Sequence, residues 1–292
     1  MERIRVSAPA SSANLGPGYD CLGVALPLRN VVEVEQRPGP LEVVVTGEGA
    51  GTLPCDATNL VVRSFAEAWD GPLEGLAFHM HNEVPLQSGT GSSSAAIVAG
   101  LAAGLALRGL PYGTDDLIAL AAPIEGHPDN VAAAIAGGFT VALDGGAPLV
   151  RRIEPPAGLG FVLVVPDHAL GTEESRKSLR VDVPRADAVY SLQRTALLVY
   201  ALAQGDLEAL PQALDDRLHQ PDRADLTPMF CELQAHLPRL GAFGCTLSGA
   251  GPSTLVWVRA DEAGRVAAEV AELLPRATVT ALAPEPRGVI VS

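Results

Sequence analysis

The sequence predicts an α+β fold in which helices pack on β-sheets, divided into two domains at residues 1–155 and 156–292. Hydrophobic residues make up 48% of the 292 residues, but aromatic residues make up only 4%, and Ala, Val and Leu supply most of the apolar content. Such a composition favours helices on a sheet over a β-sandwich. Segments typical of strands and of helices follow one another, and Pro155-Pro156, near several Gly residues, predicts the domain boundary.

In the first half, alternation of apolar and polar residues predicts strands, and helical spacing of apolar residues predicts helices. A run of Ser precedes the longest helix, and Thr114 precedes a helix with two Asp in its first turn, so we expect these residues as N-caps. The expected strands are residues 3–8, 31–36, 41–46 and 76–81, and the expected helices are 59–69, 93–108 and 115–124.

In the second half, a continuous apolar run at residues 161–165 predicts a buried strand, and strands then alternate with helices. This order indicates an α+β sandwich of ferredoxin-like character. The other expected strands are residues 245–247, 254–258 and 277–282, and the expected helices are 186–204, 207–218, 228–237 and 261–274.

Composition also argues against several classes of partner. The chain has a net charge of −14 and no run of basic residues, so it lacks the positive surface on which nucleic-acid binding depends. The same negative charge disfavours binding to anionic membranes. The most apolar stretch, residues 95–107, is too short to span a bilayer, and residues 1–6 contain no signal-peptide core. The four Cys form no C-x-x-C pair. We therefore expect a cytoplasmic protein with neither nucleic-acid nor membrane partners.

The first segment with chemical character is residues 85–95, Pro-Leu-Gln-Ser-Gly-Thr-Gly-Ser-Ser-Ser-Ala, which leads into the predicted small-residue helix. Two Gly let the backbone approach a ligand closely, and the Ser run places N–H and hydroxyl groups at a helix N-terminus, which favours anions. A Ser hydroxyl there can also bind Mg²⁺. A flexible capped turn would have the same composition. The Walker pattern is absent, because Lys177 is the only lysine.

The second segment is residues 125–130, Glu-Gly-His-Pro-Asp-Asn. Glu125 can complete a Mg²⁺ shell together with a Ser hydroxyl. Asn130 can orient a substrate hydroxyl, and Asp129 is the candidate general base of the segment. A helix-capping turn formed by Asp129 or Asn130 explains the segment equally well. The third segment, residues 247–253, contains a Gly-x-Gly turn that closes over a ligand or simply connects two strands.

Taken in order, the three segments resemble the three motifs of the GHMP kinase family, which transfers the γ-phosphoryl group of ATP to small alcohols. The resemblance covers essentially the whole chain. Residues 9–23, 125–130 and 216–223 resemble the members that phosphorylate homoserine, and residues 11–14 lack the Lys or Arg that other branches carry there. The resemblance implies a two-domain GHMP kinase fold, with a nucleotide loop in an N-terminal α/β domain, a ferredoxin-like C-terminal domain and the acceptor between them.

The resemblance also implies roles for individual residues. The residues expected to bind ATP are Asn59, Pro85, Gly89, Thr90, Gly91, Ser92, Ser93, Ser94 and Ala95. Ser93, or its neighbour Ser92, and Glu125 are expected to bind Mg²⁺. The residues expected to bind the acceptor are Asn14, Asp20, Asn130, Arg176 and Arg223. The expected catalytic set is Ser93, Glu125, Asp129 and Asn130, in which Asp129 is structural or assists weakly because phosphoryl transfer depends mainly on positioning.

These residue types suit L-homoserine, since two Arg can bind its carboxylate, Asp20 its ammonium group and the amides its hydroxyl. The resemblance thus implies ATP-dependent formation of O-phospho-L-homoserine for threonine biosynthesis, in an enzyme that is expected to dimerise. The alternatives are a GHMP kinase with another alcohol acceptor and a catalytically silent ligand-binding member.

Four positions depart from the family pattern. In the first segment, Thr90 replaces the usual Leu and Ser94 replaces the usual Ala. Arg180 stands where Pro is usual, and Asp222 stands where an aromatic residue is common.

Overall fold

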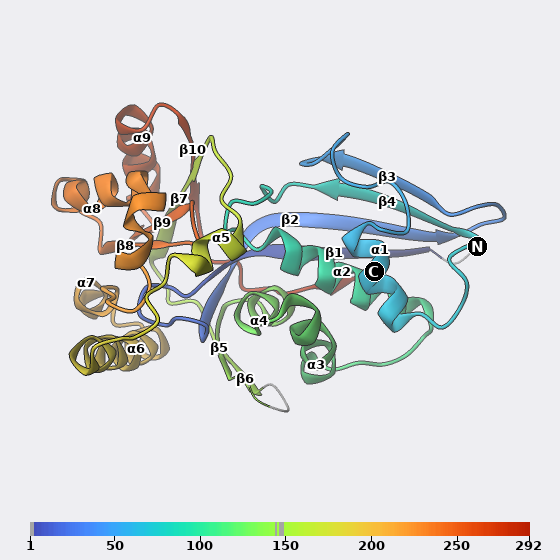
Figure 1. The fold of residues 1–292 in the computed structure, drawn as a ribbon, viewed down its shortest axis with the longest axis horizontal. Coiled ribbons are helices and arrows are strands. Elements are labelled where there is room, and N and C mark those ends of the chain that lie inside the picture. The colour runs from blue at the N-terminus through green and yellow to red at the C-terminus, as the bar shows by residue number, and fades with distance from the viewer. Residues whose placement is uncertain (1–2, 144, 146–148) are drawn as a thin grey trace.

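The computed structural model describes residues 3–143, 145 and 149–292. Met1 and Glu2, which belong to the segment 1–6 where no signal-peptide core is expected, lie outside the described residues. Within this described part, the chain forms a seven-stranded and a four-stranded sheet. The two sheets lie beside each other along the long axis of the molecule, each with helices packed against it (Figure 1). The α+β fold class predicted from the sequence is confirmed.

The seven-stranded sheet has the order β11-β1-β2-β4-β3, with β5 and β6 continuing from β2. Its strands are β1 (Arg3–Ala13), β2 (Leu22–Gln36), β3 (Glu42–Gly47), β4 (Leu76–Asn82), β5 (Phe139–Leu143), β6 (Leu149–Ile153) and β11 (Ile290–Val291). Strand β2 is longer than predicted because its second half pairs with β4 and its first residues pair with β5.

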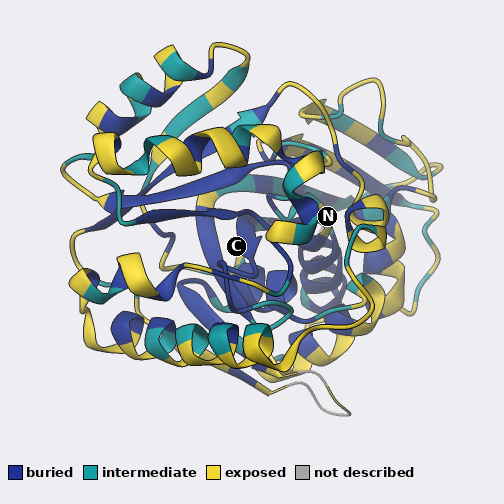
Figure 2. Cartoon of the chain, turned by 60° about the vertical axis from the view of Figure 1, so that its left-hand side comes forward, coloured by how far each residue is buried: buried dark blue, intermediate teal, exposed yellow. Residues whose placement is uncertain are grey.

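Four helices cover one face of this sheet: α1 (Leu60–Ala68), α2 (Ser92–Leu107), α3 (Thr114–Glu125) and α4 (Asp129–Ala136) (Figure 1). Helix α2 is buried along almost its whole length and runs through the interior of the molecule (Figure 2). A Cβ atom on Gly100 would lie 2.3 Å from the carbonyl oxygen of Val61, so glycine allows α1 to pack directly on α2. The caps predicted from Ser residues and Thr114 are wrong, because Gly91 and Gly113 occupy these N-cap positions.

The four-stranded sheet has the antiparallel order β10-β7-β9-β8, which is the ferredoxin-like arrangement of a βαββαβ unit. Its strands are β7 (Leu159–Pro166), β8 (Gly244–Leu247), β9 (Thr254–Arg259) and β10 (Ala277–Leu282). Helices α8 (Pro228–Leu240) and α9 (Ala263–Leu273) pack on one face of this sheet, and residues of α6 (Arg185–Gln204) belong to the core on its opposite face.

The helix predicted at residues 207–218 is shorter in the structure. It consists of the 3₁₀ helix η1 (Leu207–Ala209) and α7 (Leu210–Ala213). The buried carboxylate of Asp216 accepts hydrogen bonds from the backbone N–H groups of residues 218, 219 and 220, at 2.8, 3.0 and 2.9 Å. These bonds give the backbone an alternative to the helix. Two helices were not predicted, α5 (Thr172–Lys177) and the 3₁₀ helix η2 (Pro221–Leu226), and neither were strands β5, β6 and β11.

The two sheets share a hydrophobic core. Phe139 on β5 packs against Phe161 on β7 and Trp257 on β9, with ring centroids 6.3 and 5.8 Å apart. All three side chains are buried. The division into domains at residue 155 stays a prediction, and β11, which follows it, pairs with β1. Among the described residues, no helix is both long and apolar enough to cross a membrane.

Candidate active site

The three segments with chemical character meet at one cavity of about 830 Å³ where the two halves of the molecule join. Helix α5 lies beside this junction (Figure 1). The predicted residues that line the cavity are Asn14, Asp20, Asn59, Gly89, Gly91, Ser92, Ser93, Glu125, Asp129, Asn130, Arg176 and Arg223. Pro85, Thr90, Ser94 and Ala95 are not among the lining residues.

Backbone geometry requires the two glycines of the loop between β4 and α2. Gly89 and Gly91 have φ values of +82° and +69°. An added Cβ would lie 2.2 Å from the carbonyl oxygen of Ser248 at position 89 and 2.1 Å from Ser11 Oγ at position 91. Because the N-cap Gly91 has no side chain, no side-chain hydrogen bond caps the start of α2. The uncapped N–H groups and the helix dipole make this end of the cavity suitable for phosphate oxygens.

Thr90 and Pro85 stabilise the loop from inside. Thr90 Oγ1 lies 2.7 Å from Ser88 Oγ and 3.2 Å from the Pro85 carbonyl oxygen, and the Thr90 side chain is buried. The threonine therefore replaces the apolar anchor usual in the family with hydrogen bonds inside the loop.

The third segment forms one wall of the cavity and also supports the glycine-rich loop. Ser248 Oγ donates to the carbonyl oxygen of Gly89 at 2.8 Å, and the Ser253 N–H donates to the carbonyl oxygen of Ser88 at 3.1 Å. Gly249 and Ala250 line the cavity themselves. The turn thus connects β8 and β9 and fixes the position of the glycine-rich loop.

Glu125 lies opposite the start of α2. Its Oε1 atom accepts hydrogen bonds from Ser93 Oγ at 2.7 Å and from Ser94 Oγ at 2.9 Å. Ser93 lines the cavity, whereas Ser94 is fully buried. Among the described residues, no three His, Cys, Asp or Glu side chains form a metal cluster. The Ser93 and Glu125 oxygens are ligands of the kind that Mg²⁺ prefers, with phosphate and water oxygens completing its shell.

Asp129 is buried and already hydrogen-bonded. Its Oδ1 atom accepts from the Asn130 N–H at 2.7 Å and lies 2.8 Å from His127 Nδ1. The hydrogen bond to Asp129 raises the pKa of His127 above its ordinary value, although burial lowers it. Pro128 is the N-cap of α4, so neither Asp129 nor Asn130 caps this helix. Asn130 Oδ1 accepts from Ser11 Oγ at 2.9 Å, which holds the amide at the cavity wall.

The acceptor-site candidates from the first motif are positioned by an unusual backbone. Asn14 has a φ of +70°, and its Nδ2 donates to the Gly249 carbonyl oxygen at 2.7 Å. Its Oδ1 accepts from the Asp20 N–H at 2.9 Å. Asp20 in turn forms an ion pair with Arg176 of α5, with Asp20 Oδ1 and Arg176 Nη2 3.0 Å apart. Asn14 therefore organises the site through the backbone and places the Asp20 carboxylate beside Arg176.

Arg223 lies in η2 and is 1% exposed, yet it lines the cavity. Its Nη1 atom contacts His219 Nδ1, and the Tyr19 ring centroid lies 5.7 Å from its Cζ. Neither His219 nor Tyr19 was among the predicted site residues, although both lie within segments that resembled the family.

The opposite end of the cavity is more apolar. Asn59 is the N-cap of α1, with Oδ1 accepting from the Val61 N–H and Nδ2 donating to the Pro54 carbonyl oxygen. Its amide therefore orders the cavity wall. Apolar residues that the sequence did not identify, Leu53, Pro54, Leu60, Met80 and Leu86, line the same region. Three of these residues lie in loops and two lie in regular elements, so no common sequence pattern distinguished them.

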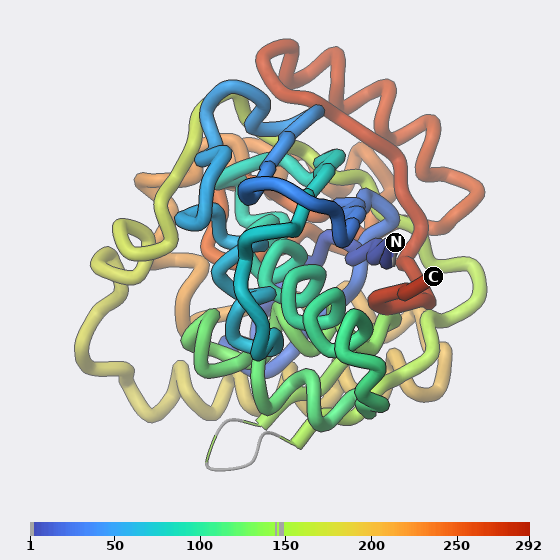
Figure 3. Tube along the Cα trace, turned by 90° about the vertical axis from the view of Figure 1, so that its right-hand side faces the viewer, coloured from blue at the N-terminus to red at the C-terminus, as the bar shows by residue number. Residues whose placement is uncertain are grey.

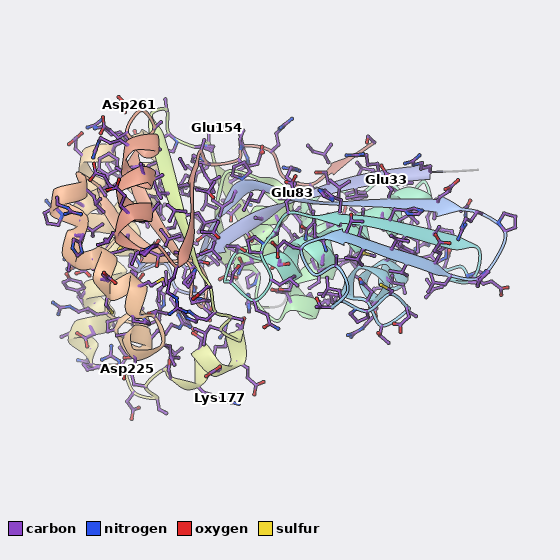
Figure 4. All side chains as sticks on the ribbon, turned by 90° about the horizontal axis from the view of Figure 1, so that it is seen from above. Glu33, Glu83, Glu154, Lys177, Asp225 and Asp261 are labelled. Atoms are coloured by element: carbon purple, nitrogen blue, oxygen red, sulfur yellow. The ribbon has the colours of Figure 1, made fainter. Side chains whose placement is uncertain are left out.

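Two of the departures from the family pattern contact each other. The Arg180 N–H donates to Asp222 Oδ2 at 3.1 Å, and the Arg180 Nε lies 3.4 Å from the same oxygen. This pair links the segment after Arg176 to the residue before Arg223. Lys177, in contrast, lies on the outer edge of the molecule (Figure 4), where it pairs with Glu173 and its side chain is 73% exposed.

Family models, curated relatives and a solved structure match this chain. The family model of the GHMP kinases N terminal domain matches residues 57–138, and that of the GHMP kinases C terminal matches residues 198–276. A homoserine kinase from Moorella thermoacetica is 40% identical over 98% of this chain and 99% of that protein. Another from Desulfitobacterium hafniense is 41% identical over 96% of this chain and 95% of that protein. The crystal structure of homoserine kinase from Cytophaga hutchinsonii covers 100% of this chain and 98% of that chain, with 28% identity and a TM-score of 0.91.

Proposed function

This chain belongs to the homoserine kinases of the GHMP kinase family, and we propose that it phosphorylates L-homoserine with ATP in the cavity between its two sheets. The product is O-phospho-L-homoserine, the form in which homoserine enters threonine biosynthesis. One observation carries the assignment of the acceptor. Asp20, Arg176 and Arg223 line the same cavity as the glycine-rich loop.

The charges of the cavity match the acceptor. L-Homoserine carries one carboxylate, one ammonium group and one hydroxyl. Arg223 is buried, and its Nε atom has no hydrogen-bond partner among the described residues. Leaving such a group unpaired is costly, so a neutral sugar would be a poor ligand here and a carboxylate a good one. Asp20 would exchange part of its contact with Arg176 for the substrate ammonium group.

The nucleotide would occupy the other part of the cavity. Its phosphates would bind the N–H groups at the start of α2 and the backbone of the loop around Gly89. The apolar wall near Leu53 and Met80 would contact the base. Ser93 and Glu125 would hold Mg²⁺, which when bound neutralises charge on the transferring phosphoryl group.

Positioning accounts for most of the proposed catalysis. Asn130, held by Ser11, would orient the acceptor hydroxyl toward the γ-phosphate. Asp129 is held by hydrogen bonds to His127 and to the Asn130 N–H, and we assign it a structural or weakly assisting role. An Asp129→Asn variant should therefore keep more than about a thousandth of the wild-type turnover. A larger loss in a folded variant would make Asp129 the general base.

The first test is a coupled ADP-release assay with Mg·ATP that compares L-homoserine with mevalonate, galactose and L-threonine. We expect turnover with L-homoserine alone, and a large rise in its KM in the Arg223→Ala variant. Turnover with only another alcohol would support the kinase activity and contradict L-homoserine as the acceptor. No turnover and no binding of Mg·ATP would favour a catalytically silent member.

The remaining assignments concern the setting of the enzyme. We propose that it acts in the cytoplasm, which the four free cysteines support. The net charge of −14 supports the absence of nucleic-acid and membrane partners. The homodimer stays a prediction, which light scattering of the purified protein tests.

A further inference from the structure

His219 lies behind Arg223, in the loop between α7 and η2, and its side chain is fully buried. One ring nitrogen, Nε2, lies 2.8 Å from the carbonyl oxygen of Gly16. The other, Nδ1, contacts Arg223 Nη1. The ring therefore connects the first motif, which positions Asn14 and Asp20, to the arginine on the other side of the acceptor site.

The partners of the ring determine its protonation. A carbonyl oxygen only accepts hydrogen bonds, so Nε2 carries a hydrogen and donates it to Gly16. A guanidinium only donates, so Nδ1 is the unprotonated nitrogen and accepts from Arg223. Burial lowers the pKa of His219 to about 4, in agreement with a neutral ring. The nearest carboxylate is that of Asp216, with Oδ2 3.5 Å from Nε2, and it is occupied by backbone N–H groups.

The neutral ring leaves the charge of Arg223 uncancelled. Arg176 pairs with the carboxylate of Asp20, whereas no carboxylate lies within 4.0 Å of Arg223 in the described residues. A carboxylate at position 219 would orient Arg223 equally well but would compete with a ligand carboxylate for its charge. A neutral acceptor orients the guanidinium and preserves its affinity for an anion.

We propose that His219 is a positioning residue that acts through Arg223, holding it in the acceptor site as a cation without a counter-ion. The proposal rests on the proposed function, because it assigns the carboxylate of the acceptor to Arg223. It adds a residue that contacts neither substrate but sets how strongly the amino-acid carboxylate is bound.

Two matched substitutions separate this role from general support of the fold. In His219→Asn, the amide oxygen stands near the position of Nδ1 and can still accept from Arg223, whereas the bond to Gly16 is lost. In His219→Gln, the amide nitrogen stands near Nε2 and can still donate to Gly16, whereas Arg223 loses its acceptor. Each variant loses one of two buried hydrogen bonds, so a purely structural role predicts similar effects.

We expect His219→Gln to raise the KM for L-homoserine about tenfold, equivalent to about 1.4 kcal/mol, and to leave the KM for ATP unchanged. His219→Asn should raise it less than about threefold. In an Arg223→Ala background, His219→Gln should have almost no further effect, because the two residues act as one unit. Equal KM values for the two single variants, or penalties that multiply in the double variant, would overturn the proposal.

The wild-type protein provides a second measurement in case the glutamine variant does not fold. Imidazole ¹⁵N spectra should show the Nε2-protonated neutral tautomer of His219 between pH 5.5 and 8. Its Nδ1 resonance should shift on addition of L-homoserine and stay unchanged on addition of ATP. A charged or Nδ1-protonated ring would overturn the proposal. Absence of wild-type turnover with L-homoserine would instead overturn the proposed function, and this proposal with it.

Discussion

Replacing Gly89 with alanine should weaken ATP binding far more than the same replacement at a glycine that contacts nothing. Gly89 has a φ of +82°, and an added Cβ would lie 2.2 Å from the Ser248 carbonyl oxygen and 2.7 Å from that of Gly251. Both atoms belong to the backbone of the turn between β8 and β9, so no side-chain rotation relieves the overlap. The glycine-rich loop and this turn must move apart.

Two contributions set the magnitude. The left-handed backbone costs alanine about 1–2 kcal/mol. Overlap with a packed neighbour adds about 1–3 kcal/mol. Gly205 is the matched control, since it has a φ of +70° but no atom within 4 Å of its added Cβ. Gly205→Ala should therefore lose about 1–2 kcal/mol of unfolding free energy, and Gly89→Ala about 2–5 kcal/mol.

Urea denaturation measures the stability difference, and steady-state kinetics measures its effect on the site. Gly89→Ala should raise the KM for ATP about tenfold or more, because displaced N–H groups no longer converge on the phosphates. Gly205→Ala should leave both KM values unchanged. If the two variants lose the same stability and Gly89→Ala binds ATP normally, the close contact between the loop and the turn is not what positions the nucleotide.

Three further predictions follow from contacts around the cavity. Ser93→Ala should raise the Mg²⁺ concentration for half-maximal turnover about tenfold, whereas Ser94→Ala should leave it unchanged and cost about 1 kcal/mol of stability. A double-mutant cycle on Arg180→Gln and Asp222→Asn should give a coupling free energy of unfolding of about 0.2–1 kcal/mol that falls at high salt. A coupling of zero would show that the Arg180–Asp222 contact does not stabilise the protein. The pKa of His127 is higher in the folded protein than in the unfolded chain, where it is about 6.5. The stability that His127 contributes is therefore fully present below pH 6.5 and is lost as the pH rises through the folded-state pKa. The stability difference between wild type and His127→Gln should therefore shrink from pH 5 to 9, and a constant difference would contradict this.

The sequence was most informative where chemistry is concentrated in short segments. Residues from all three segments line one cavity. Most of the predicted helices were also placed well, because apolar spacing within one helix is a local signal, although the helix predicted at residues 207–218 was wrong. Strands β5, β6 and β11 were missed. β5 and β11 pair with strands far away in sequence, and β6 pairs with β5.

The roles of the site residues were harder to predict than which residues line the cavity. Asn14 and Asn59 line the cavity, but their amides bind the backbone around them, which residue type alone cannot reveal. Arg180 and Asp222 appeared as two separate departures from the family pattern, and only the fold shows that they pair. The helix predicted at residues 207–218 was wrong for a local reason, because Asp216 accepts hydrogen bonds from the N–H groups of residues 218–220, which apolar spacing does not register.

Strand β11 has a consequence for the exposed edge of the larger sheet. It pairs with β1 at the edge of the seven-stranded sheet, and the two ends of the described chain lie close together (Figure 3). The Ser292 N–H and carbonyl groups also bond to Arg5. Val6 and Ser7 of β1 pair with residues 290 and 291, so this edge is covered by a contact between segments that are far apart in sequence. Local opening of β11 would expose unpaired backbone N–H and C=O groups of β1, which are the groups that pair with the strands of other chains.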